Sequence, residues 1–198
     1  EISACLVGSE MCIRDRINGF DVLKQPEEAK KCVGYLPELP PLYMDMTVKE
    51  YLDFVAELKK IEKSLRAGYV KEVMKITKTE EVSGRLIRNL SKGYRQRVGF
   101  AQAVLGYPEI LILDEPTVGL DPKQIIEIRD LIKELGKKHT IILSSHILSE
   151  ISAVCDHVFI ISHGKLVASD STENLLERMT GAQEIELLVK AEEDTAET

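Results

Sequence analysis

The sequence predicts an α/β protein with a mostly parallel sheet, because short apolar segments typical of strands alternate with segments whose apolar residues recur at helical spacing. Segments 33–36 and 110–113 are two of the expected strands. A third, 140–143, has the continuous apolar character of a strand buried on both faces of a parallel sheet. The chain has 198 residues, of which 44% are hydrophobic, so we expect one domain with one sizeable core.

The first half of the chain contains one strand and two helices. The strand 33–36 ends at Pro37, where a proline-rich loop begins. Segment 47–50 reads Thr-Val-Lys-Glu, the spacing of a capping box, and predicts the start of a helix. One face of this helix carries Val48, Leu52, Val55 and Leu58. A second helical segment covers about 62–77, so we expect a helical layer, at about 47–90, inserted between parts of the sheet.

Two further helices have clear start signals. Ser91 is a good N-cap for a helix that runs to about Leu105, before the strand 110–113. Asp121 precedes Pro122 in the order of a capping carboxylate and a first-turn proline. The next helix is expected to end at Gly136 and to pack into the core through Ile125, Ile128, Ile132 and Leu135.

The last part of the chain is expected to hold shorter elements. A helix is predicted at about 147–154, and segments 158–161 and 166–168 flank His163-Gly164 as in a hairpin. In segment 184–189 polar and apolar residues alternate, which predicts one more strand. It lies in a C-terminal segment, 181–198, that ends in an acidic tail.

The first 16 residues have no clear period, no helix cap and no match to the rest of the chain. They resemble translated adapter sequence from read assembly, so we expect 1–16 to be non-native, with a divergent N-terminal strand as the alternative. Residues 17–180 are then the expected domain.

Composition excludes several classes of protein. A net charge of −7 at pH 7 is unfavourable for binding the phosphate backbone of nucleic acids, so we expect no nucleic-acid partner. No apolar run approaches the about 20 residues that a membrane-spanning helix needs, so membrane contact would come through a partner protein. The four cysteines lack the spacing of a zinc site and are expected to be free thiols in a reducing compartment.

Asp114 and Glu115 come directly after the strand 110–113, at the position where open α/β sheets present ligand-binding side chains. Neighbouring residues of a strand point to opposite faces, so the two carboxylates could divide their tasks. Asp114 could hold Mg²⁺ while Glu115 polarises an attacking water. Taken alone, such a pair is often only a solvated turn.

Two other positions could contact phosphate. The helix that opens at Ser91 offers a hydroxyl, the Gly93 amide and the positive end of a helix dipole. His146 comes after the strand 140–143, so the sheet would carry it to the same edge as Asp114, where a neutral imidazole could donate to a phosphate. Alone, the first is also compatible with an ordinary capped helix and the second with a structural histidine.

Together, in this order and spacing, these segments resemble the nucleotide-binding domain of ABC transporters, from about residue 17 to 171. The resemblance implies a RecA-like sheet core with an inserted helical subdomain, incomplete at the N-terminus. It makes 90–94 the signature motif, 110–115 the Walker B strand and 119–122 the D-loop. His146 becomes the switch histidine, and Glu38 takes the place of the Q-loop glutamine.

The resemblance also implies roles for individual residues. Glu115 and His146 would be catalytic; Asp114, with Glu38, would bind Mg²⁺; and the residues that contact ATP would be Ser91, Lys92, Gly93, Glu38 and Asp121. Two departures matter. Lys92 replaces the first signature glycine, and the carboxylate of Glu38 adds negative charge near the triphosphate.

No G-x-x-x-x-G-K-[ST] segment, the loop whose backbone N–H groups surround the β- and γ-phosphates, occurs in the chain. In the family it would precede segment 17–21, where 1–16 now stands. We therefore predict that this polypeptide is N-terminally truncated, binds ATP weakly or not at all, and does not hydrolyse it.

The resemblance is to the exporter branch, whose ATPase and membrane subunits are separate chains. It implies a cytoplasmic subunit on the inner face of the membrane, bound to a transmembrane permease, that works as a homodimer or with a sister subunit. In such a dimer Ser91 would reach ATP held by the other subunit. The alternatives are a soluble ABC-type ATPase of translation or DNA maintenance, and a noncatalytic regulatory module.

Overall fold

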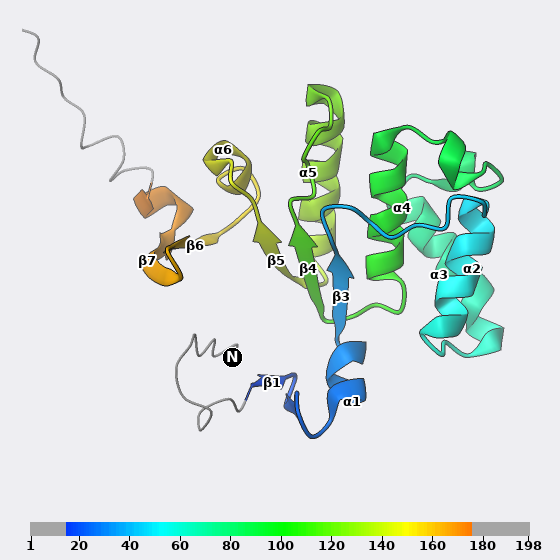
Figure 1. Cartoon of the computed structure of the whole chain (residues 1–198), viewed down its shortest axis with the longest axis horizontal. Helices are drawn as coiled ribbons and strands as arrows, with labels where there is room; N and C mark the ends of the chain where they lie inside the picture. Colours follow the sequence, from blue (N-terminus) through cyan, green and yellow to red (C-terminus); the bar gives the residue numbers. More distant parts are fainter. Residues whose placement is uncertain (1–14, 176–198) are drawn as a thin grey trace, which may run out of the picture. The chain divides into compact units, whose positions relative to one another are not determined.

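The computed structural model describes residues 15–175. The chain divides into two compact units, 1–154 and 155–198 (Figure 1). The predicted strand 184–189 and almost all of the segment 1–16 lie outside the described residues. The predicted domain span, 17–180, stays a prediction.

The first unit is organised around a parallel sheet of three strands, in the order β3-β4-β5. They are β3 (Val33–Leu36), β4 (Ile110–Asp114) and β5 (Thr140–Ser144). In register, Leu36 lies opposite Leu113, and Asp114 lies opposite Ser144. The carboxyl ends of the strands therefore meet at one edge of the sheet, as predicted from the three apolar segments (Figure 1).

Two long helices connect the strands. Helix α4 (Lys92–Val104) leads into β4 and packs against β3, and α5 (Pro122–Gly136) joins β4 to β5 and packs against β5. Both begin at the same side of the sheet where the strands end (Figure 1). The predicted caps are confirmed: the Ser91 and Asp121 side chains accept hydrogen bonds from the Tyr94 and Gln124 amides.

The helical layer consists of α2 (Val48–Leu58) and α3 (Lys63–Ile76), with short 3₁₀ helices at Glu80–Val82 and Ile87–Asn89. The capping box at the start of α2 is confirmed, since the Thr47 and Glu50 side chains bond each other's backbone amides. Leu58 is a correction: it ends the helix and is 62% exposed, whereas Val48, Leu52 and Val55 are buried. The buried face of α2 therefore ends with Val55 and Ala56.

The N-terminal elements are short and were only partly predicted. A two-stranded hairpin pairs β1 (Arg16–Ile17) with β2 (Phe20–Asp21), and α1 (Pro26–Lys31) comes next. Helix α1 was not predicted from the sequence, although a first-turn proline, two early glutamates and two late lysines are ordinary helix signals.

One contiguous core joins the sheet to the helical layer, and its largest fully buried side chains include Phe100, Leu111, Leu113 and Ile128. The expectation that β5 is buried on both faces is wrong. Its residues alternate between exposed and half-buried, and Ile142 is 40% exposed. Within residues 15–175, β5 pairs with β4 alone, so it lacks the second neighbouring strand of a central position.

Beyond β5 the first unit ends with α6 (Leu148–Ile151), a shorter helix than the predicted 147–154. The second unit contains an antiparallel pair, β6 (His157–Ser162) and β7 (Lys165–Ser171). The predicted turn at His163-Gly164 is confirmed, with both residues at positive φ.

Candidate active site

Asp114, the last residue of β4, is held by hydroxyl groups from both neighbouring strands. Ser144, its partner in register on β5, donates from Oγ to Asp114 Oδ1 at 2.5 Å. Tyr35 on β3 donates from its hydroxyl to Asp114 Oδ2 at 3.4 Å. Each carboxylate oxygen has more than one acceptor position, so these bonds orient Asp114 and leave it able to bind a further group.

Glu115 lies in the turn just after β4 and has an unusual backbone. Its φ is +45°, in the left-handed region that costs a non-glycine residue about 1–2 kcal/mol. The Glu115 amide donates to the Ser144 carbonyl at 3.2 Å and lies 3.3 Å from Ser144 Oγ. Hydrogen bonds to β5 therefore hold this strained residue.

The Glu115 side chain is 20% exposed and points toward the loop after β5. One oxygen, Oε1, lies 2.8 Å from His146 Nδ1, and the other, Oε2, is buried and has no hydrogen-bond partner among the described residues. A buried unpartnered carboxylate oxygen is costly in a fold and common where a ligand or water completes the site. The side chains of Asp114 and Glu115 thus have different partners, the hydroxyls of Ser144 and Tyr35 for Asp114 and the His146 ring for Glu115.

His146 follows β5 by two residues, and its side chain is 68% exposed. Its contact with Glu115, the residue after Asp114, agrees with the prediction that the sheet brings His146 to the same edge as Asp114. The hydrogen bond to Glu115 and that residue's charge raise the pKa of His146 above 6.5, with smaller contributions from the charges of Glu150 and Glu38. We expected a neutral imidazole, but this acidic surrounding favours the imidazolium.

Glu38 is exposed in the loop after β3, close enough for its charge to act on His146. The three loops after β3, β4 and β5 therefore bring Glu38, Glu115 and His146 to one acidic edge. Sequence reasoning missed Tyr35 and Ser144, the two residues that hold Asp114. Aligning the strand ends in register would have found Ser144.

The turn at Ser91 forms a second group with the D-loop segment. Lys92 packs on Gly119, where an added Cβ would lie 3.3 Å from Lys92 Cε. Gly93 is buried against Gln124, and a Cβ there would lie 2.6 Å from the Gln124 Cδ. Within residues 15–175 no hydrogen bond or ion pair joins this group to Asp114, Glu115 or His146.

The strand-end group has the donors that Mg²⁺ takes in nucleotide sites, where one or two carboxylates are joined by phosphate oxygens and waters. Asp114 offers an oriented carboxylate, and Glu38 offers an exposed one in the loop after β3. The described part of the chain contains no cluster of three or more His, Cys, Asp or Glu side chains able to hold a metal by themselves. These residues therefore fit a site in which Mg²⁺ is bound jointly by protein carboxylates, phosphate oxygens and waters, and not a site made of protein ligands alone.

The chain also matches known proteins. A model of the ABC transporter family matches residues 2–118. This chain belongs to the ABC transporter family. The match includes residues 2–16, and the proposal that this segment is non-native stays a prediction.

Two ABC transporter relatives illustrate the likeness. The chain is 41% identical over 164 residues to the bacitracin transport ATP-binding protein BcrA of Bacillus licheniformis, covering 82% of this chain and 53% of that protein. It is 34% identical over 163 residues to the ABC transporter ATP-binding protein NatA of Bacillus subtilis, covering 81% of this chain and 66% of that protein. The chain thus spans about half the length of BcrA.

Solved structures confirm the predicted fold. The structure of cbiO1 from Clostridium perfringens, described as part of the ABC transporter complex cbiONQ, superposes with a TM-score of 0.76 at 26% identity, covering 84% of this chain and 68% of that one. An ATP-binding subunit of an ABC transporter gives 0.70 at 29% identity, covering 83% and 69%. The fold is the α/β fold of ABC ATPases. In the part described, no helix has the length and apolar character needed to cross a bilayer.

Proposed function

We propose that this chain acts as an ATP-binding subunit that powers transport by an ABC transporter. One observation carries the proposal beyond family membership: after the carboxyl ends of β4 and β5, His146 pairs with one oxygen of Glu115, while the other is buried and unpartnered within the part of the chain that the structure describes. This is an acid-base pair with one acceptor left for a reactant, beside the oriented carboxylate of Asp114.

Each residue at this edge then has a separate task. Asp114, with Glu38, would hold Mg²⁺, and the bound ion would supply positive charge to the phosphate oxygens. Glu115 would accept a hydrogen bond from the attacking water through its free oxygen. His146, with Nδ1 on Glu115, has Nε2 available to donate to a phosphate oxygen.

The signature turn would act on a second nucleotide. Ser91, Lys92 and Gly93 lie together at the start of α4, where the helix dipole favours an anion. We propose that they contact ATP held by a second copy or a sister subunit. Asp121 supports this arrangement by capping α5, the helix whose Gln124 packs against Gly93.

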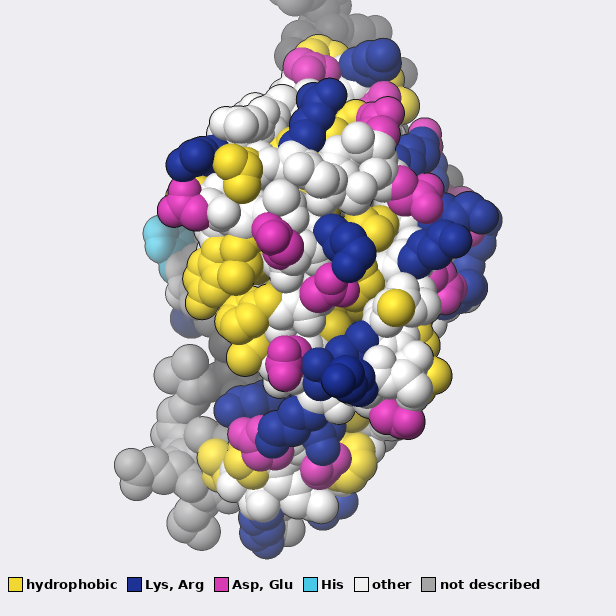
Figure 2. Space-filling view, turned by 90° about the vertical axis from the view of Figure 1, so that its right-hand side faces the viewer, with side chains coloured by type: hydrophobic (Ala, Val, Ile, Leu, Met, Phe, Trp, Pro, Cys, Tyr) yellow, Lys and Arg dark blue, Asp and Glu magenta, His cyan; other side chains and the backbone are white. Residues whose placement is uncertain are grey.

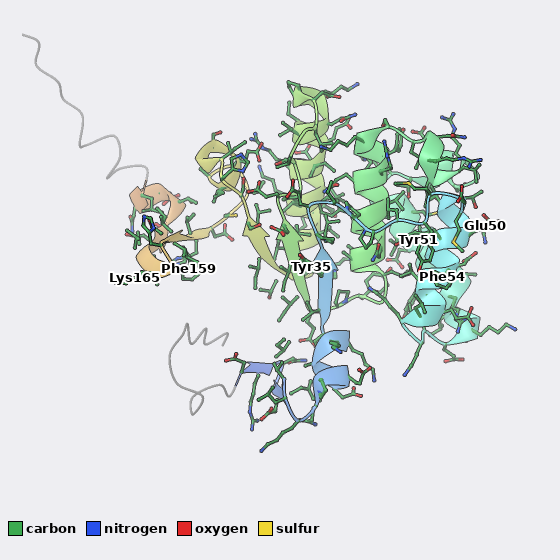
Figure 3. All side chains as sticks on the ribbon, viewed as in Figure 1. Tyr35, Glu50, Tyr51, Phe54, Phe159 and Lys165 are labelled. Atoms are coloured by element: carbon green, nitrogen blue, oxygen red, sulfur yellow. The ribbon has the colours of Figure 1, made fainter. Side chains whose placement is uncertain are left out.

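The membrane partner would be a separate permease. An aromatic cluster next to the helical layer supports this proposal: the ring of Tyr43 lies 5.9 Å from that of Tyr51, which is buried, and 5.4 Å from that of Phe54. Figure 3 labels Tyr51 and Phe54 on α2. Tyr43 is 52% exposed and lies in the loop that contains Glu38. On the side of the molecule seen in Figure 2, hydrophobic side chains lie in small groups between charged side chains. The subunit would thus lie on the cytoplasmic side of the membrane, with 47–90 as its helical subdomain.

The 198 residues contain no G-x-x-x-x-G-K-[ST] segment, so this polypeptide should bind Mg-ATP weakly and not turn it over. The test is an amide and imidazole NMR titration with Mg-ATP at millimolar concentration, beside a phosphate-release assay. We expect shifts at Glu115, Ser144 and His146, abolished in Asp114→Asn, and no phosphate release.

The matched control is Asp130→Asn, which removes a carboxylate from the exposed side of α5 and should leave the shifts intact. Mg-ATP that perturbs none of the three residues would contradict the proposed site. Phosphate release that depends on Glu115 would contradict the proposed lack of turnover.

A further inference from the structure

A buried polar cluster lies behind the strand-end group, outside the residues assigned above. Glu150 on α6 is 6% exposed, and its Oε2 accepts a hydrogen bond from the hydroxyl of Thr117, which is also 6% exposed. A guanidinium nitrogen of Arg129 on α5 lies 4.0 Å from the other oxygen of Glu150. The cluster thus joins the turn after β4, helix α5 and the segment after β5.

A cavity of about 10 Å³ adjoins this cluster and is lined in part by Thr117, Arg129, Ser145 and Glu150. It has room for about one water molecule. Arg129 Nε is buried and has no hydrogen-bond partner among residues 15–175, so it could donate to such a water. A buried carboxylate is destabilising unless hydrogen bonds and opposite charge surround it, and here both are present.

Along the chain, the residues of this cluster lie close to the residues of the strand-end group. Thr117 lies two residues after Glu115, and Glu150 lies four residues after His146. The hydrogen bond between them therefore ties the far ends of the same two loops that meet at the Glu115–His146 contact. Glu115 also has a left-handed backbone, which persists only where the surroundings hold it.

We propose that Glu150 is a positioning residue, whose hydrogen bond to Thr117 fixes the loop that carries Glu115 against the loop that carries His146. A catalytic role for this tie rests on the proposed function, but the tie itself needs no nucleotide. Without it, the turn after β4 would relax from its strained conformation, and the Glu115 amide would lose its bond to Ser144.

Amide hydrogen exchange in the nucleotide-free protein tests the tie at the Glu115 amide. Thr117→Val is nearly isosteric and removes the hydroxyl, so it should speed exchange of the Glu115 amide about tenfold, the loss expected for a hydrogen bond to a charged group. Thr117→Ser keeps the hydroxyl and should change the rate less than about threefold. Glu150→Gln keeps an acceptor without the charge and should fall between the two.

The Val98 amide in α4, where the side chain is fully buried, reports on general stability and should be unchanged in all three variants. The proposal is overturned by equal acceleration in the Val and Ser variants, by no acceleration at Glu115 in Thr117→Val, or by equal acceleration at Val98. If Thr117→Val does not fold, the other two variants provide the test. The Glu115 amide should then exchange faster in Glu150→Gln than in Thr117→Ser, and the reverse order or equal rates would overturn the proposal. If Mg-ATP causes no NMR shifts but the exchange rates follow the predicted order, the proposed function is contradicted and the positioning role of Glu150 is supported.

Discussion

The strand-end group and the two helix caps use similar side chains in opposite ways. At the caps, Ser91 and Asp121 each accept a hydrogen bond from a backbone amide three residues on, within their own element. At the strand ends, Asp114, Glu115 and His146 bond to side chains from other strands and loops, and one Glu115 oxygen has no partner. The caps stabilise their helices, whereas the strand ends carry strain and an open acceptor.

This difference separates the Asp121 carboxylate, which its own helix uses, from carboxylates that remain able to act on a ligand, whereas Ser91 is proposed to serve both as a cap and as an ATP contact. A carboxylate satisfied by its own helix contributes local stability, and its removal should cost free energy of unfolding. A strained residue with an unpartnered buried oxygen is the kind of feature that function retains at some cost in stability.

The largest effect is expected in the core beneath the strand ends. Leu113 is fully buried in β4 directly before Asp114, so Leu113→Ala should lower the free energy of unfolding by about 2–5 kcal/mol. Leu58→Ala, at a leucine that is 62% exposed, is the matched control and should change it by less than about 0.5 kcal/mol. Urea denaturation measures both, and similar losses would contradict the described core.

A smaller effect is expected at the caps. Asp121→Ala removes the bond to the Gln124 amide and should cost about 0.5–2 kcal/mol, while Asp121→Asn keeps an acceptor and should cost little. The same urea measurements decide. If alanine is as stable as wild type, Asp121 is not acting as a cap, and its contrast with the strand-end carboxylates fails.

The sequence predicted the fold well where a local signal and the final environment agree. The capping box at Thr47, the caps at Ser91 and Asp121, and the apolar strand 110–113 were each read from neighbouring residues and are confirmed. The prediction that β5 is buried on both faces was wrong, because an apolar segment shows which residues could be buried and not how many strands lie beside them.

The site was predictable only in part for the same reason. Asp114, Glu115 and His146 could be placed at one edge, since parallel strands end together. Their hydroxyl partners, Tyr35 and Ser144, depend on the register between strands, which no local pattern encodes. The partnership of Thr117 with Glu150 joins residues 33 positions apart and needed the packed loops to become visible.

The proposed site depends above all on one contact: the loops after β4 and β5 bring Glu115 and His146 together as one ionisable pair. Because the paired carboxylate raises the pKa of His146, the pair contributes stability that is fully present below pH 6.5 and is lost as the pH rises through the folded-state pKa. An NMR titration of the His146 ring measures this directly. We predict a midpoint above 6.5 in the wild-type chain that falls toward 6.5 in Glu115→Gln, and the same midpoint in both proteins would contradict the pairing.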